Sequence, residues 1–391
     1  MLLLPWLLGA DWLQFRGSDN RSVAEGPEAV EFDAATGKNV AWKAPLPGRG
    51  PSSPIVVGNR VFVTASSGAQ QNELHVLCLD VATGKTLWQR NMWATGSSIA
   101  NGFGAVAAPT PAIDGKRIYV FYSSNDLACF DLDGKLLWLR GLGFESPTTR
   151  NDVGMGSSPL VIEDTVIVQC ECQGESFALG VDAATGATRW RIEREHTAIW
   201  TSPTLLTNAQ GDHFALLQGR AKLIAIRPRT GETAWEYDAA CHTIASAATD
   251  QGVVYLPAIG LHAVAFDEQT KTAKRLWYED RMRSDNCSVV AAEGKVYAIK
   301  PPGILMAADA TDGKLLWQLR LTGPFWATPL LVGKELVCVN HAGLVQIVKT
   351  EPKGELVSTA TIDEGILATP AVASGAIYFR SDRNLWKISG R

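Results

Sequence analysis

The chain has 391 residues, of which 46% are hydrophobic and 19% are charged. This balance is typical of a soluble, folded protein and argues against a disordered or membrane-spanning one. Forty acidic side chains against 36 basic ones give a net charge of −4, with no run of like charges. A nucleic-acid-binding surface is therefore not expected.

The N-terminal residues 1–10, MLLLPWLLGA, form an apolar stretch that ends in Ala10 before Asp11. They resemble the end of a secretory signal peptide, although no Lys or Arg precedes them and Leu8 stands where a small residue is preferred. An apolar N-terminal strand is the alternative. No other stretch reaches the roughly 18 continuous apolar residues of a transmembrane helix. We therefore expect a periplasmic or otherwise exported protein with no transmembrane segment.

Residues 52–91 contain four short apolar runs separated by turn residues: PIVV, NRVFVTA, LHVLCLD and TLWQRN. Their alternation with polar residues favours strands over helices. The proline that opens this unit recurs along the chain, with two substitutes, at eight positions: Pro54, Pro111, Pro159, Pro203, Ala247, Val289, Pro329 and Pro370.

The same unit closes on the pattern Asp-x-x-Thr-Gly-Lys-x-x-Trp in its fullest form. Seven tryptophans mark this closure, namely Trp42, Trp88, Trp138, Trp190, Trp235, Trp277 and Trp317, and Ser358 stands in the eighth position. The first closure has no opening before it, and the last opening has no closure after it. The strand near Trp42 is therefore expected to complete the sheet that begins near Pro370.

Four strands at a period of roughly 40–50 residues are typical of the blades of a β-propeller. We predict an all-β fold, an eight-bladed β-propeller of four-stranded antiparallel blades formed as a single domain by residues 11–391. The ring is closed by the N-terminal strand, and each repeat tryptophan is expected to wedge between two blades. A closed ring leaves no edge that needs pairing, so we expect a monomer.

The closing pattern resembles the tryptophan-docking motif of the pyrroloquinoline quinone (PQQ) repeat over roughly residues 33–389. Two branches of this superfamily bear on function. The quinoprotein dehydrogenases are eight-bladed enzymes that hold PQQ and calcium in a central funnel, whereas outer-membrane assembly factor B is an eight-bladed scaffold without a quinone. The stretches DWLQFRG and NVAWKAPLPGRGPSSP also resemble bacterial PQQ-like repeat proteins, abundant in planctomycetes, whose function is undefined.

The chain departs from both branches. It has no adjacent cysteine pair of the kind that many quinoprotein alcohol dehydrogenases carry, and it is shorter than they are. It also has no cysteine before Cys78 to carry the lipid of the assembly factor. The resemblance implies a non-catalytic binding or scaffold protein of the bacterial cell envelope, with a protein, peptide or glycan partner and no cofactor. The alternative is a PQQ- and calcium-dependent oxidoreductase acting on an alcohol or sugar.

Seven scattered cysteines leave at least one unpaired. Cys78 and Cys129 occupy the same place in two repeats and are interpreted as small buried hydrophobic residues. Cys170 and Cys172 face the same side of a predicted strand and suit a metal or a disulfide, but no second Cys/His pair accompanies them.

The segments before the eight openings converge at one mouth of the channel, and two of them, residues 91–108 and 141–157, are long enough to build a site. Their candidate binding residues are Arg49, Asn101, Asn151, Asp152, His196, Trp200, His242, Arg283, Asp285, Asn286 and Trp326. Arginine would suit the PQQ carboxylates, and Asp and Asn would suit calcium, but a plain solvated rim has the same composition. No Ser or Cys nucleophile motif accompanies His196 or His242, so no catalytic residue is assigned. Zinc-type spacing of Cys and His is absent, so no metal ligand is assigned.

Overall fold

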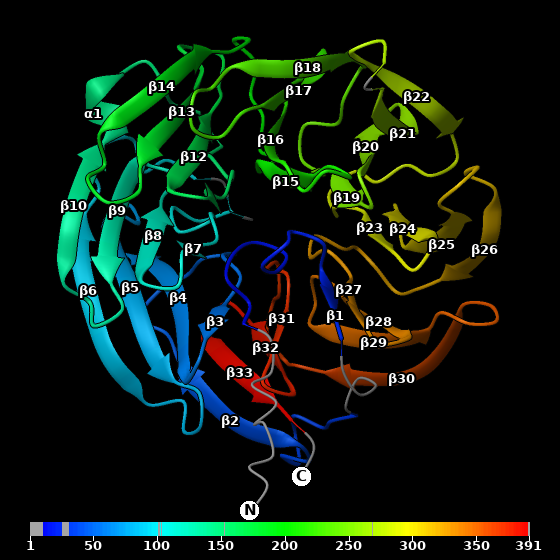
Figure 1. The fold of residues 1–391 in the computed structure, drawn as a ribbon. Coiled ribbons are helices and arrows are strands. Elements are labelled where there is room, and N and C mark those ends of the chain that lie inside the picture. The colour runs from blue at the N-terminus through cyan, green and yellow to red at the C-terminus, as the bar shows by residue number, and fades with distance from the viewer. Residues whose placement is uncertain are drawn as a thin grey trace, which may run out of the picture.

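The computed structural model describes residues 11–25, 31–100, 102, 104–151, 153–267 and 269–389. Eight sheets stand around a central axis, each with four antiparallel strands, and one of them carries a fifth strand (Figure 1). The predicted all-β, eight-bladed β-propeller is therefore confirmed. The signal-like residues 1–10 and two candidate site residues, Asn101 and Asp152, lie outside the described residues.

The strands of each blade are given below in order from the channel outward. Blade 1 has β3 (Ile55–Val57), β4 (Arg60–Ser67), β5 (Glu73–Asp80) and β6 (Thr86–Trp93). Blade 2 has β7 (Ala112–Ile113), β8 (Arg117–Phe121), β9 (Asp126–Asp131) and β10 (Leu136–Gly141). Blade 3 has β11 (Leu160–Ile162), β12 (Thr165–Cys170), β13 (Phe177–Asp182) and β14 (Thr188–Glu193). Blade 4 has β15 (Thr204–Thr207), β16 (His213–Gln218), β17 (Lys222–Ile226) and β18 (Thr233–Asp238).

Blades 5 to 8 continue the ring. Blade 5 has β19 (Ala248–Asp250), β20 (Val253–Ala258), β21 (Gly260–Asp267) and β22 (Thr272–Glu279). Blade 6 has β23 (Val290–Ala292), β24 (Lys295–Lys300), β25 (Ile304–Asp309) and β26 (Leu315–Arg320). Blade 7 has β27 (Leu330–Val332), β28 (Glu335–Val339), β29 (Leu344–Lys349) and β30 (Glu355–Thr361). Blade 8 has β31 (Ala371–Ala373), β32 (Ala376–Arg380), β33 (Asn384–Ile388) and β2 (Val40–Pro45).

Blade 8 joins the two ends of the described chain. Strand β2 pairs antiparallel with β33, from Val40 opposite Ile388 to Pro45 opposite Asn384. The outer strand of this blade therefore comes from the N-terminal part of the chain and its other three strands from the C-terminal part, as predicted (Figure 1). Backbone hydrogen bonds between these strands close the ring.

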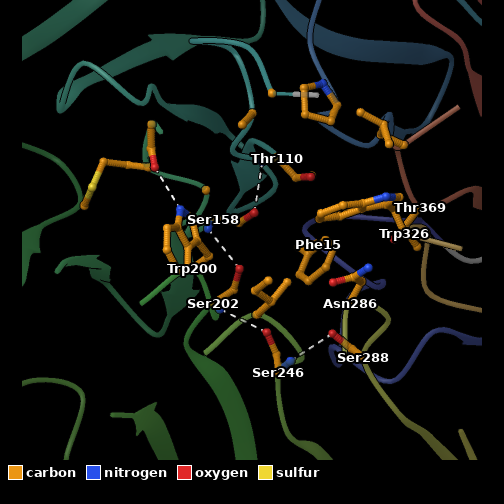
Figure 2. A pocket seen from close by; sticks show the side chains of 18 of the residues that line it. Phe15, Thr110, Ser158, Trp200, Ser202, Ser246, Asn286, Ser288, Trp326 and Thr369 are labelled. Atoms are coloured by element: carbon orange, nitrogen blue, oxygen red, sulfur yellow. Dashed lines mark hydrogen bonds between the residues drawn. The ribbon is translucent and has the colours of Figure 1, made fainter. Parts of the chain in front are cut away.

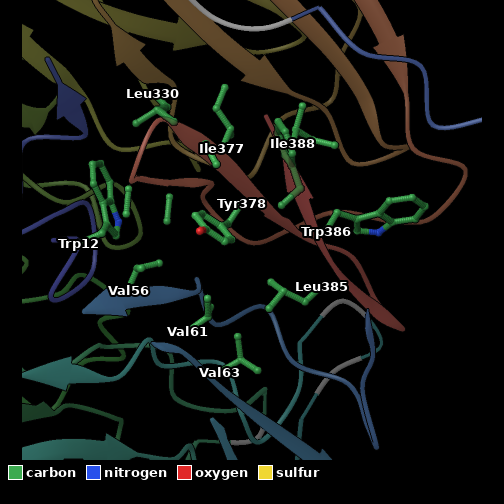
Figure 3. Close-up of a cluster of buried hydrophobic side chains, with 14 of the residues drawn as sticks. Trp12, Val56, Val61, Val63, Leu330, Ile377, Tyr378, Leu385, Trp386 and Ile388 are labelled. Atoms are coloured by element: carbon green, nitrogen blue, oxygen red, sulfur yellow. The ribbon is translucent and has the colours of Figure 1, made fainter. Parts of the chain in front are cut away.

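The inner strands are buried on both faces because every blade lies between two others. All six residues of β12 are buried, whereas β14 at the rim of the same blade alternates between exposed and covered positions. Side chains of blades 7, 8 and 1 meet in one hydrophobic cluster, which includes Tyr378 of β32 and Val61 of β4 (Figure 3). This pattern explains why inner strands have continuous apolar sequences.

The repeat tryptophans lie between blades. Six of them donate their indole N–H to a carbonyl of the next blade at 2.8–3.2 Å: Trp42 to Val81, Trp88 to Leu132, Trp138 to Ala183, Trp190 to Pro228, Trp277 to Ala310 and Trp317 to Thr350. The seventh, Trp235, stacks on Phe266 of blade 5 with ring centroids 6.2 Å apart. Each indole thus fastens one blade to the next.

Glycine is required where these indoles meet the neighbouring turn. A Cβ on Gly231, which has φ +73°, would lie 2.6 Å from the Trp190 ring, so a larger residue does not fit. The turn that holds Gly37 in blade 8 differs, because nothing lies within 4 Å of such a Cβ. The preceding blade carries Ser358 in place of tryptophan, which leaves this turn uncovered.

Residues 11–24 form a plug across the channel, which the sequence did not predict. Trp12 pairs with Val56 of blade 1, and Leu13 accepts a hydrogen bond from the backbone N–H of Ile113 in blade 2. At the other end of the plug, β1 (Val23–Ala24) pairs in parallel with β27 of blade 7. The blue segment at the centre of Figure 1 is this plug.

Arg16 anchors the middle of the plug. Its side chain is fully buried and donates to the carbonyl oxygens of Ala247 (2.7 Å) and Val289 (3.5 Å) and to the hydroxyl of Thr204 (3.3 Å). These acceptors belong to blades 4, 5 and 6. Burial lowers the pKa of Arg16 to about 10, so the guanidinium remains charged at neutral pH and binds the three blades together.

The described residues contain one helix, α1 (Leu142–Glu145), which follows β10 at the mouth of blade 2 and was not predicted. It has four residues, so it is far too short to cross a membrane, and no other part of the described chain provides a helix that could.

Candidate functional site

A cavity of about 340 Å³ lies at the mouth of the channel formed by the segments before the inner strands (Figure 2). All eight blades contribute to its wall, from Pro51 of blade 1 to Thr369 of blade 8. Phe15 of the plug is part of this wall. Its neighbours Leu13 and Arg16 hydrogen-bond to Ile113 and Ala247, so the plug that spans the channel contributes an aromatic ring to the cavity.

A ring of hydroxyl groups runs around this cavity. The residue before each opening is Ser or Thr, and the backbone N–H of one donates to the hydroxyl of the next at 2.9–3.2 Å. The series runs through Ser53, Thr110, Ser158, Ser202, Ser246, Ser288, Thr328 and Thr369. Figure 2 labels six of these residues, all except Ser53 and Thr328. Because each bond joins two neighbouring blades, the ring fixes the mouth segments relative to one another.

This hydroxyl ring was missed in the sequence, although the signal was available. A Ser or Thr precedes all eight openings, including Ala247 and Val289, where the proline is lost. The ring has seven links, because the side-chain oxygen of Ser53 is buried and has no hydrogen-bond partner among the described residues. The break therefore lies between Thr369 of blade 8 and Ser53 of blade 1.

Two tryptophans line the open side of the cavity. The indole N–H of Trp200 donates to the carbonyl of Gly154 at 2.8 Å, and its backbone N–H donates to Thr243 at 2.7 Å. Trp200 is thereby held by blades 3 and 5 on either side of its own. Trp326 of blade 7 lies across the cavity from it (Figure 2).

Three of the candidate residues line this cavity: Trp200, Asn286 and Trp326. Asn151 is buried behind it, where its side-chain oxygen accepts a hydrogen bond from the backbone N–H of Val153. Arg283 and His196 are exposed and are not part of the wall.

The other described candidates, Arg49, His242 and Asp285, lie outside the wall, each beside a group that can carry the opposite charge. The Arg49 guanidinium lies 3.7 Å from Asp382, and the His242 ring lies 3.8 Å from the Asp285 carboxylate. Burial lowers the pKa of His242, and Asp285 offsets part of this shift. The described wall of the cavity therefore contains no charged side chain and no histidine.

The described residues do not fit the PQQ–calcium alternative at this cavity. Three quinone carboxylates need cationic or N–H donors, and the wall offers hydroxyls, one side-chain amide and apolar groups. No group of three or more His, Cys, Asp or Glu side chains suited to a metal ion is present among the described residues. We therefore derive no reaction step through the quinone.

The cysteines offer no reactive site. All seven are buried and unpaired, including Cys170 and Cys172, for which a metal or a disulfide was considered. Burial raises the pKa of Cys78 and of Cys129 to about 12. Such thiols remain protonated at neutral pH, which agrees with their interpretation as buried hydrophobic residues.

An exposed apolar rim lies beside the cavity over blades 1 to 3. It consists of Trp93, Ile99, Phe144 and Val153, of which Trp93 and Phe144 are 66% and 79% exposed. Their loops touch one another, because a Cβ on Gly96 would lie 3.2 Å from Gly143 of α1, and one on Gly154 would lie 3.3 Å from the Ile99 carbonyl. Val153 also lines the cavity, so these touching loops reach from the cavity wall to the exposed aromatic side chains.

Comparison with known proteins places the chain in a family. The family described as "Outer membrane protein assembly factor BamB" matches residues 14–180 and 174–391. Proteins of that name from Burkholderia pseudomallei and Bordetella pertussis are each 23% identical to it. These alignments cover 89% and 88% of this chain and 87% and 84% of theirs.

Solved structures show the same fold. BamB from Moraxella catarrhalis superimposes with a TM-score of 0.65 at 17% identity, covering 90% of this chain and 97% of that one. Quinohemoprotein alcohol dehydrogenase from Comamonas testosteroni superimposes with a TM-score of 0.72 at 15% identity, covering 97% of this chain and 81% of the enzyme. These likenesses concern the fold alone. The family match spans nearly the whole described chain, and the protein therefore belongs to the PQQ-like β-propeller family described as outer membrane protein assembly factor BamB.

Proposed function

We propose that this chain is a non-catalytic β-propeller of the bacterial cell envelope that binds a partner protein on its mouth face. The observation that carries the proposal is the apolar rim beside the uncharged cavity. Exposed apolar side chains that gather on neighbouring loops commonly mark sites of protein contact. The rim residues lie on loops held by a rigid ring, as is usual for binding sites.

Two further observations support this proposal. The relatives from Burkholderia pseudomallei and Bordetella pertussis are named outer membrane assembly factors, which places those proteins in the cell envelope. The apolar residues 1–10 suit export. A partner that covers the rim would remove Trp93 and Phe144 from water, and each buried aromatic side chain contributes roughly 2–3 kcal/mol.

The alternative, a quinoprotein oxidoreductase, has less support. The chain shares the fold of quinohemoprotein alcohol dehydrogenase, but fold does not determine function. The described wall of the cavity lacks the cationic groups that the quinone carboxylates require.

Position-specific photocrosslinking tests the proposal. A photoreactive residue is placed at Trp93 or Phe144 on the rim, and at Leu87 or Leu316 on outer strands as controls, in protein exported to the bacterial envelope. Leu87 and Leu316 are also exposed and apolar, at 50% and 47%. We expect one discrete protein adduct from both rim positions and none from the controls, and weaker capture when Phe144→Asp is added to the Trp93 probe. Equal labelling from all four positions, or none, would contradict the proposal.

A further inference from the structure

We propose that the mouth cavity receives one large apolar side chain from the partner protein, as the anchor of the contact made by the apolar rim. This inference rests on the proposed function and names the chemistry of its central contact. Interfaces commonly concentrate their binding energy in one or two aromatic or aliphatic anchors that fill a pocket.

The wall of the cavity selects against charge. None of the described residues that line it is charged, and its large apolar side chains include two tryptophans, Ile244 and Leu367. A carboxylate or an ammonium group that entered would lose water and meet no opposite charge, which is costly. An uncharged apolar group loses little and gains contact with the indole rings.

The cavity has the size and closure for a single inserted group. Its volume of about 340 Å³ is at the lower end of the range for ligand pockets. The plug that carries Phe15 spans the channel and is bound to blades 1, 5 and 7, so a polypeptide cannot thread through. An occupant must enter from the mouth and end there, as a side chain does.

The cavity is also held open before any ligand arrives. The hydroxyl ring joins neighbouring blades by seven hydrogen bonds, and Trp200 is fixed through Gly154 and Thr243. A preformed site avoids the cost of ordering its walls on binding. The cavity is therefore a preformed, rigid binding site.

The rim identifies the occupant as part of a protein. Val153 belongs to both the cavity wall and the apolar rim, and the loops that carry the other rim residues, Ile99, Trp93 and Phe144, touch one another beside it. A free small molecule in the cavity would leave these side chains in water. A partner protein that inserts one side chain into the cavity would also cover the exposed rim side chains with its neighbouring residues.

Small capped amino acids provide the test. The probes are N-acetyl-phenylalaninamide and N-acetyl-leucinamide, compared with the capped amides of glutamate and lysine and with N-acetylglucosamine. Binding is followed by the indole N–H signals of Trp200 and Trp326 in NMR spectra of ¹⁵N-labelled protein, assigned with the Trp→Phe variants. We expect saturable shifts of both signals with the two apolar probes, with a Kd on the order of 1 mM, and at least tenfold weaker binding of the other three.

Cavity-filling variants provide the control. Ala108→Phe and Gly156→Leu place bulk inside the wall, and Gly156 has open space except for Trp200 at 3.4 Å. Either change should abolish the shifts produced by the apolar probes. Leu316→Phe on outer strand β26 should leave them unchanged. Tighter binding of a charged or sugar probe, or no shift with any probe, would overturn the inference.

The crosslinking experiment separates this inference from the proposed function. If the rim positions Trp93 and Phe144 still capture their partner at undiminished yield in folded Ala108→Phe and Gly156→Leu, the partner binds the rim without using the cavity, and only this inference fails. If the unaltered protein captures no partner from the rim while the apolar probes still bind, the proposed function fails instead. We expect both filling variants to reduce capture at least tenfold.

Discussion

Replacing Trp190 by alanine should destabilise the whole ring. Its side chain is 7% exposed, lies against Gly180 and Gly231, and donates to the Pro228 carbonyl of blade 4 at 2.8 Å. Burial of roughly 200 Å² at about 25 cal/mol per Å² corresponds to about 5 kcal/mol. Alanine retains a small part of this, and measured costs of such truncations are about 3–5 kcal/mol.

The assay is thermal unfolding, monitored by differential scanning calorimetry. An unfolding entropy of about 2.1 cal/mol/K per residue over 391 residues means that 4 kcal/mol lowers Tm by about 5 °C. Trp93→Ala is the matched control, because that indole is 66% exposed, and its Tm should change by about 1 °C or less. Equal shifts for the two variants would refute the wedge interpretation of the repeat tryptophans.

Three further predictions concern other contacts. Arg194→Met should lower the free energy of unfolding by about 3–5 kcal/mol at neutral pH. The Arg194 guanidinium lies 2.8 Å from the Glu171 carboxylate, whose side chain is 1% exposed, so the substitution leaves a buried carboxylate without its ion-pair partner. Burial raises the pKa of Glu171, so the folded state favours its protonated form. The loss of stability caused by Arg194→Met should therefore shrink as the pH falls from 7.5 towards 5. A loss that grows on acidification would contradict this. Arg16→Met should speed amide hydrogen exchange in β15, β19 and β23 by at least tenfold, and unchanged exchange would show that the plug does not bind these blades together. Ser358→Trp should raise Tm by a few degrees, because the uncovered Gly37 turn would receive an indole; a lower Tm would show that this blade cannot accept one.

The repeat made the fold predictable. Each blade repeats the same alternation and turn chemistry, so eight openings and seven tryptophans located the blades and the split sheet at β2 and β33. The plug was not predictable in this way, because residues 11–24 occur once and owe their conformation to contacts with inner strands far along the chain. Arg16, for example, is more than 180 residues from each of its acceptors.

The sequence indicated which segments converge at the mouth, but it could not show which of their side chains face the cavity. The segments before the openings do converge, and Trp200, Asn286 and Trp326 meet at the cavity. The charged candidates stay outside its wall, since the sequence cannot show that Arg49 turns towards Asp382 or that His242 faces Asp285. The aromatic floor was missed because Phe15 comes from the plug.

On the reasoning above, the mouth binds a partner protein and does not bind a quinone. Titration of the purified protein with PQQ, with and without calcium, followed by tryptophan fluorescence and a dye-coupled alcohol oxidation assay, tests it most directly. We expect no saturable quenching and no turnover in either condition. Stoichiometric, calcium-dependent binding accompanied by alcohol oxidation would contradict it and identify the chain as a dehydrogenase.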